Sequence, residues 1–246
     1  MRRAIRRAIR RAMRGAVIAL GAIMAGRTAG AQHAGPDRQL WADFVPSWRV
    51  GAQATDELEL SFRTSWKGAA PTQYWVTNTF EWNVRPWLGL DAVGAVVESR
   101  GPTPGTGYFE MRPAAGVRLT WRGTRFRASE LMKVEHRMLR PLGGEAVSIE
   151  RVRHREQVVW ALNHASLAMP RTAFVIADAE WFLVHGDHGG WLSNQLRARA
   201  GLGYRWNDRR SFELILNDTR RRGTTSLEFE DGDHVLRVRW KEALGR

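Results

Sequence analysis

The stretch that decides the fold is residues 196–206, which read LRARAGLGYRW. Apolar or small residues occupy every second position, and arginine or glycine occupies the positions between them. Successive side chains of a β-strand project to opposite faces, so a period of two indicates a strand with one apolar and one charged face.

The same alternation recurs along the chain. Short separators such as 85–86 and 122–124 alternate with longer ones such as 100–107 and 185–190. Short turns at one end and longer loops at the other are typical of a transmembrane β-barrel, and tilted strands of about 9–11 residues cross a membrane. We count eleven candidate strands: 39–49, 56–66, 73–84, 87–98, 109–121, 125–137, 147–162, 172–184, 191–206, 210–219 and 233–241.

The pattern predicts an all-β protein, an antiparallel up-and-down transmembrane β-barrel of ten to twelve strands. Bacterial single-chain barrels normally have an even number of strands. Either the segment interrupted by Pro46 is therefore not a full strand, or residues 226–230 add another. Tryptophans at predicted strand ends, such as Trp66 and Trp206, fit interfacial aromatic girdles. The alternative is a soluble β-sandwich or lipocalin-like barrel, whose apolar faces point inward.

The net charge of +13 is unevenly distributed. Residues 1–31 hold eight arginines and no acid, so the rest of the chain carries only +5. A basic start, the apolar run 15–26 and Ala29-Gly30-Ala31 predict a secretory signal peptide over 1–31, cleaved after about Ala31. Residues 32–246 then form a single barrel domain in the outer membrane of a Gram-negative type envelope. The chain has no cysteine, which excludes disulfides and thiolate metal sites.

If the apolar faces meet lipid, the charged faces line the interior. Asp178 and Glu180 lie in sequence between two arginine-rich segments, which predicts cross-strand ion pairs. Such pairs either fill a narrow interior or leave an arginine ladder that prefers anions. The alternation fails at Glu130, His136, His154 and Glu156, which fall on the outward side, either at strand ends or through a bulge. The predicted lumen-lining residues are Arg125, Arg127, Arg137, Arg151, Arg153, Arg155, Asp178, Glu180, Arg197, Arg199, Arg237 and Arg239.

Several segments in a fixed order carry a resemblance to a known family. They are Arg125-Phe126-Arg127, RVRHR at 151–155, DAEWF at 178–182, LRARAGLGYR at 196–205 and RSFEL at 210–214. In this order they resemble the bacterial outer-membrane proteins of domain-of-unknown-function family 2490, over roughly residues 38–241. The resemblance implies an outer-membrane barrel with no established activity and no catalytic residues to transfer. One departure is that Trp240 is followed by KEALGR, whereas many outer-membrane chains end on an aromatic residue.

The sequence thus favours a barrel of undefined role, either structural or a narrow, anion-leaning pore. We predict no catalytic residue, cofactor or metal ligand. The expected partners are outer-membrane lipid, the barrel-assembly machinery and small anionic solutes; nucleic acid is not expected, because the basic residues alternate within strands. The alternative is an outer-membrane hydrolase with a site at the external loop around His185–His188. A second set, Asn163, His164 and Ser166, is adjacent in sequence and reads as a turn.

Overall fold

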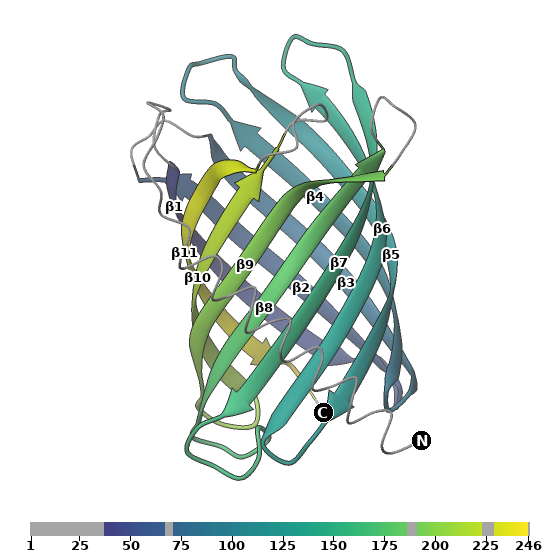
Figure 1. Ribbon diagram of the computed structural model, residues 1–246, viewed down its shortest axis with the longest axis vertical. Helices are drawn as coiled ribbons and strands as arrows, with labels where there is room; N and C mark the ends of the chain where they lie inside the picture. Colours follow the sequence, from purple (N-terminus) through teal and green to yellow (C-terminus); the bar gives the residue numbers. More distant parts are fainter. Residues whose placement is uncertain (1–36, 67–70, 186–190, 223–228, 246) are drawn as a thin grey trace.

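In the computed structural model, eleven β-strands run obliquely around one closed barrel (Figure 1). The structure describes residues 37–66, 71–185, 191–222 and 229–245. No helix in these ranges is long and apolar enough to cross a membrane. The strands are β1 (Asp37–Arg49), β2 (Ala54–Ser65), β3 (Thr72–Arg85), β4 (Leu88–Arg100), β5 (Gly107–Arg122), β6 (Phe126–Pro141), β7 (Val147–Ala161), β8 (Thr172–His185), β9 (Trp191–Arg205), β10 (Arg210–Arg221) and β11 (Glu230–Ala243).

Strands that are consecutive in sequence pair antiparallel, and β1 pairs parallel with β11 to close the barrel. This parallel register extends from Asp37 opposite Asp233 to Ser47 opposite Ala243. The all-β barrel class is therefore confirmed. The expectation of an even strand number and of purely antiparallel pairing was wrong. Parallel pairing of β1 with β11 satisfies the backbone hydrogen bonds of both edge strands, so the barrel closes with an odd number of strands.

The segment that contains Pro46 is a full strand, contrary to the first explanation offered for the odd count. Pro46 lacks an N–H, and the pairing of β1 with β2 is interrupted between Phe44 and Ser47. The register with β11 continues past it. The second explanation, an extra strand at 226–230, falls mostly on residues 226–228, which lie outside the described residues; β11 begins at Glu230.

Short turns gather at one end of the barrel, as predicted. They are residues 50–53, 86–87, 123–125 and 206–209, at the lower rim in Figure 1. The segment 162–171 at the same end is longer and was not expected there. It is held by its own hydrogen bonds: Asn163 donates to the carbonyl of Arg171 (2.9 Å), and Thr172 Oγ1 donates to that of Met169 (2.6 Å).

The two faces of the strands differ sharply in polarity. Large apolar side chains such as Phe62, Leu202 and Leu216 are exposed on the outward face. Glu110, Asp178 and Glu180, by contrast, are almost fully buried on the inward face. Large apolar side chains therefore cover the outward face, and buried charged side chains lie on the inward face.

An apolar cluster lies in the interior near the short-turn end. Val159, Phe174, Ile176 and Ile215 form a buried cluster, and Leu167 of the 162–171 loop packs against it. The Gly-Leu-Gly of the stretch 196–206 makes room for this cluster. A Cβ atom at Gly203 would lie 2.2 Å from the Phe174 ring. The inward glycines of β9 therefore leave space for the bulky side chains of the neighbouring strands; they do not mark turns.

Candidate functional site in the barrel interior

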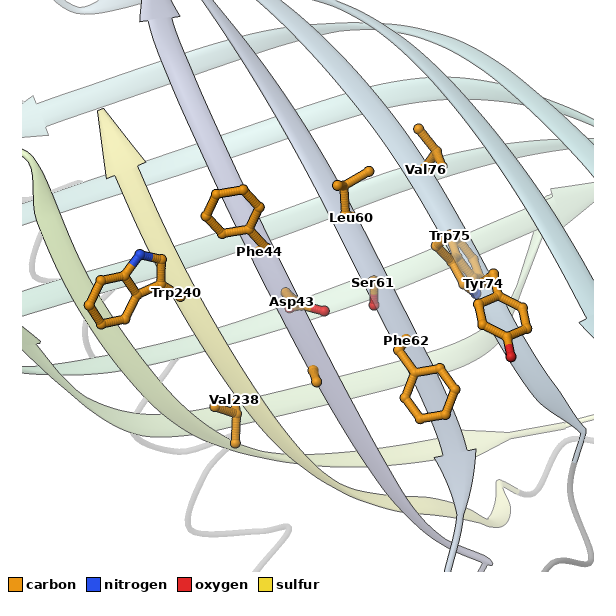
Figure 2. A pocket seen from close by; sticks show the side chains of 11 residues that line it. Asp43, Phe44, Leu60, Ser61, Phe62, Tyr74, Trp75, Val76, Val238 and Trp240 are labelled. Carbon is orange, nitrogen blue, oxygen red and sulfur yellow. The ribbon is translucent and has the colours of Figure 1, made fainter. Parts of the chain in front are cut away.

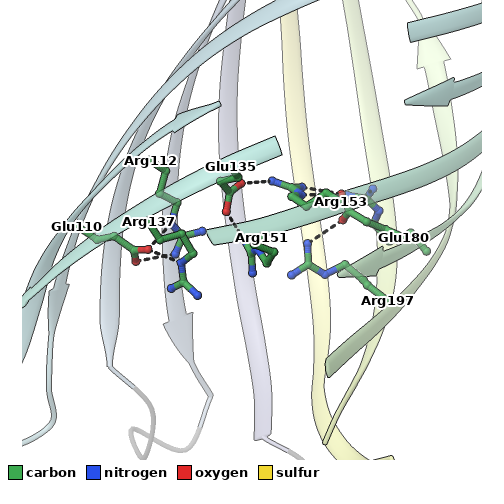
Figure 3. Close-up of polar contacts among 9 residues, drawn as sticks. Glu110, Arg112, Glu135, Arg137, Arg151, Arg153, Glu180 and Arg197 are labelled. Atoms are coloured by element: carbon green, nitrogen blue, oxygen red, sulfur yellow. Dashed lines mark hydrogen bonds and ion pairs between the residues drawn. The ribbon is translucent and has the colours of Figure 1, made fainter. Parts of the chain in front are cut away.

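Two groups of ion pairs lie on the inward faces of β5, β6 and β7 (Figure 3). Glu110 accepts hydrogen bonds from Arg112 (2.7 Å) on its own strand and from Arg137 of β6 (2.5 Å). Glu135 of β6 pairs with Arg151 and, at 3.0 Å, with Arg153 of β7. Each buried carboxylate therefore holds two guanidinium groups.

The group around Glu135 continues through Arg153 to β8 and β9. Glu180, which is 1% exposed, accepts from Arg153 at 2.6 Å and from Arg197 at 3.2 Å, and lies 3.7 Å from Arg199. Asp178 accepts from Arg199 at 2.5 Å. The cross-strand pairing expected from the position of Asp178 and Glu180 between arginine-rich strands is found here.

A second network lies inside the parallel seam. Asp43 of β1 pairs with Arg237 and, at 3.3 Å, with Arg239, both on β11. Glu59 of β2 lies 2.9 Å from each of the same two arginines, and Glu213 of β10 lies 3.3 Å from Arg239. Charge-assisted bonds therefore join the first two strands to the last two across the point where the barrel closes.

Three of the predicted lumen-lining arginines take no part in these networks. Arg127 and Arg155 lie on the inward faces of β6 and β7, yet neither forms an ion pair with a carboxylate of the described residues, and Arg155 Nε is buried without a hydrogen-bond partner. Arg125 does not line the interior: it precedes β6, is exposed and donates to the carbonyls of Leu162 (3.0 Å) and His164 (3.2 Å). It fixes the 162–171 loop.

Sequence reasoning missed Asp43 because the segment with Pro46 was doubted as a strand. Its period-two pattern places Trp41, Asp43 and Val45 on one face, and all three are buried. That alternation was a usable signal. The stacking of Arg63 between Trp41 and Trp75, at 3.9 and 3.7 Å from the ring centroids, had no such signal, because it depends on the register of β1, β2 and β3.

Charged side chains also lie on the outward face of β6 and β7. His154 Nε2 is 3.0 Å from Glu130, and the His154 ring stacks on Trp181 of β8 with ring centroids 5.6 Å apart. The pairing of β6 with β7 is unbroken from Phe126 to Leu139, so no bulge between these strands explains the reversed polarity.

The hydrolase alternative concerns the loop around His185–His188, and a second candidate set is Asn163, His164 and Ser166. Residues 186–190 and the side chain of His185 lie outside the described residues, so the hydrolase alternative stays a prediction. Asn163 and Ser166 accept hydrogen bonds from the backbone: Ala173 N, at the start of β8, donates to Asn163 Oδ1 (2.8 Å), and Ala168 N donates to Ser166 Oγ (3.2 Å). Within the described ranges, no group of three or more His, Asp or Glu side chains could hold a metal ion.

The outward face carries a shallow apolar depression of about 490 Å³ over the seam (Figure 2). Phe44, Leu60, Phe62 and Trp240 stand around it. Ala42, which also lines it, lies opposite Phe62 and Val238 in the strand registers. Its walls come from β11, β1, β2 and β3. The seam that is charged inside is therefore apolar outside.

The protein is a closed single-chain β-barrel. A parallel seam closes it, buried ion pairs lie inside, and apolar side chains lie outside. The model of the family described as "Protein of unknown function (DUF2490)" matches residues 38–225. The chain belongs to this family, as the order of its motifs indicated. No curated protein and no solved structure matches the chain.

Proposed function

We propose that this protein is an outer-membrane β-barrel whose interior is a narrow, anion-preferring path rather than an open pore. The observation that carries the proposal is the inverted polarity: exposed Phe, Leu, Val and Trp outside, with buried Arg, Asp and Glu inside. A soluble barrel would bury its large apolar side chains, whereas lipid requires them on the outside. Outer-membrane lipid and the barrel-assembly machinery are the partners that this location requires, with export directed by residues 1–31.

The filled interior supports a narrow path. Ion pairs bridge neighbouring strands, and the apolar cluster around Phe174 occupies the short-turn end. Barrels of about eight strands are packed solid and those of about 16–18 hold open channels, so eleven strands lie between these regimes. A general diffusion pore would require these side chains to be displaced.

The excess of cations supports the anion preference. Arg63, Arg127 and Arg155 face inward and form no ion pair with any carboxylate in the described ranges, whereas Glu110, Glu135 and Glu180 each hold at least two arginines. Guanidinium groups stay protonated, so a positive potential remains in the interior. Rings and ladders of arginine favour anions.

Planar-bilayer recording tests the path. In a potassium chloride gradient we expect a small conductance whose reversal potential has the sign of chloride selectivity. Arg155→Gln removes one uncompensated charge and should move the reversal potential toward zero. A wide, non-selective conductance like that of large porins, or cation selectivity, would contradict the proposal, and a folded protein with no current would eliminate the path while leaving the barrel.

Single-cysteine labelling tests the membrane assignment. Because the chain has no cysteine of its own, each introduced cysteine is the only thiol that can be labelled. Leu216 on the outward face of β10 and Leu142 in a loop are equally exposed, at 65% and 60%. In vesicles with both surfaces accessible, Leu216→Cys should resist a water-soluble maleimide and react with a lipid-soluble one, whereas Leu142→Cys should react with both. Equal labelling of the two by the water-soluble reagent would contradict membrane insertion.

A further inference from the structure

Arg63 differs from the other deeply buried arginines of the interior. Its residue is 9% exposed, and its guanidinium carbon lies 3.9 Å above the Trp41 ring and 3.7 Å above the Trp75 ring. Trp41 is directly opposite Arg63 in the β1–β2 register, and Trp75 lies on β3 opposite Ser61. Two indole faces therefore clamp one guanidinium plane.

The two rings that form this clamp are themselves fixed. Trp41 Nε1 donates to Gln39 Oε1 at 2.9 Å, and Trp75 Nε1 donates to Gln73 Oε1 at 2.9 Å. The Gln73 amide in turn donates to Tyr108 OH at 3.0 Å. Hydrogen bonds at the ring edges leave little freedom for either indole to tilt away, so the Arg63 plane is held in one orientation.

The guanidinium of Arg63 is nevertheless short of acceptors. It makes one hydrogen bond, from Nε to Ser61 Oγ at 3.2 Å, and in the part of the chain that the structure describes no carboxylate lies within ion-pair distance of it. Arginine carries five N–H donors and cannot lose its charge in a protein. The four N–H groups on its two terminal nitrogens have no protein acceptor among the described residues.

The nearby carboxylates are engaged elsewhere. Asp43 and Glu59 both bind Arg237 and Arg239, with Glu59 at 2.9 Å from each. Other cations border the same two rings: Arg112 lies 4.2 Å from the Trp75 ring, and Arg197 and Arg237 each lie 5.7 Å from the Trp41 ring. A guanidinium without an ion-pair partner among the described residues thus lies between two ring faces that keep water from its own two faces.

We infer that the Trp41–Arg63–Trp75 clamp is a binding site for a small oxyanion, a phosphate or carboxylate group that offers two oxygens to the edge of Arg63. A planar guanidinium pairs with such a group through two parallel hydrogen bonds, which a spherical ion cannot form. Stacking supplies the fixed orientation that this pairing needs. The site lies toward the long-loop end, where Arg63 is close to the end of β2. It deepens the proposed anion preference, since it names the class of anion and where it is held.

The test is titration of the full mature protein in detergent with inorganic phosphate, acetate and chloride, followed by calorimetry and by tryptophan fluorescence. We expect saturable binding of phosphate or acetate, with a change in fluorescence because two tryptophans flank the site, and much weaker binding of chloride. Arg63→Met should weaken oxyanion binding by about tenfold or more, because charged hydrogen bonds are lost. Arg63→Lys, which keeps the charge but not the planar edge, should fall between the two.

The matched control is Arg100→Met. Arg100 also lies over an aromatic ring, that of Tyr74 at 5.4 Å, but its side chain is exposed and pairs with Glu98. This variant should bind phosphate like the parent. Equal binding by the parent and Arg63→Met, or no preference over chloride, would overturn the inference; if the methionine variant does not fold, Arg63→Lys decides. Because binding is measured without a membrane current, a silent bilayer would reject the conducting path and leave this site standing.

Discussion

Replacing Glu180 by glutamine removes the charge at the centre of the interior network without changing the size of the side chain. Glu180 is 1% exposed and is the only carboxylate paired with Arg197 among the described residues, at 3.2 Å. Arg153 keeps Glu135 at 3.0 Å, and Arg199 keeps Asp178 at 2.5 Å. The substitution therefore leaves one buried guanidinium unpaired and weakens two others.

Removing one partner of a buried ion pair costs about 3–5 kcal/mol, because the other charge stays buried without compensation. The glutamine carbonyl can still accept one hydrogen bond, so we expect Glu180→Gln to lower the free energy of unfolding by about 3 kcal/mol, the lower end of that range. Adding Arg197→Met removes the orphaned charge and should recover part of the loss, because the pair is then replaced rather than broken.

Urea unfolding in detergent micelles, followed by tryptophan fluorescence, measures the change. Glu98→Gln is the control: Glu98 pairs with Arg100 at the same kind of distance, 2.8 Å, but both side chains are more than half exposed. It should not change the unfolding midpoint measurably. If Glu180→Gln unfolds at the same urea concentration as Glu98→Gln, the interior ion pairs do not hold the barrel together and the reasoning fails.

Two further substitutions test the packing and the outer face. Gly203→Ala places a Cβ 2.2 Å from the Phe174 ring and should destabilise the barrel by about 1–3 kcal/mol in the same assay. In the control Gly94→Ala the new Cβ meets no atom within 4 Å, so this variant should be as stable as the parent. Equal stability of the two variants would contradict the packing of the apolar cluster. Leu60→Arg puts a charge in the outward depression and should lower the free energy of unfolding in lipid by about 2–4 kcal/mol if the site lies near the membrane midplane. Leu142→Arg, in a loop, should not change the stability. Equal stability of the two variants in vesicles would speak against a lipid-facing seam.

The strands and their faces were predictable because alternation is a local property. The stretch 196–206 shows its inward arginines and outward apolar residues directly, and Arg197 and Arg199 lie in the interior with the expected acidic partners. Each prediction of this kind needs only the sequence of one strand and its two neighbours. For that reason the pairing of Asp178 and Glu180 could be expected in advance.

The parallel seam and the stacking around Arg63 were not predictable, because they depend on residues far apart in sequence. The parallel pairing of β1 with β11 joins Trp41 to Arg237 through a register that no local pattern encodes. The clamp around Arg63 requires that β1, β2 and β3 align within one residue. The apolar cluster was missed for a related reason: Phe174 and Ile215 look like ordinary strand residues until the glycines of β9 are placed opposite them.

We propose that the apolar outer face of this barrel lies in the outer membrane. The most direct measurement is fractionation of Gram-negative cells that express the full chain, with gel migration compared before and after boiling. We expect protein in the outer-membrane fraction, shortened by loss of residues 1–31, resistant to urea extraction and migrating differently when unboiled. Mature protein recovered soluble in the periplasm, with the same migration in both samples, would contradict it.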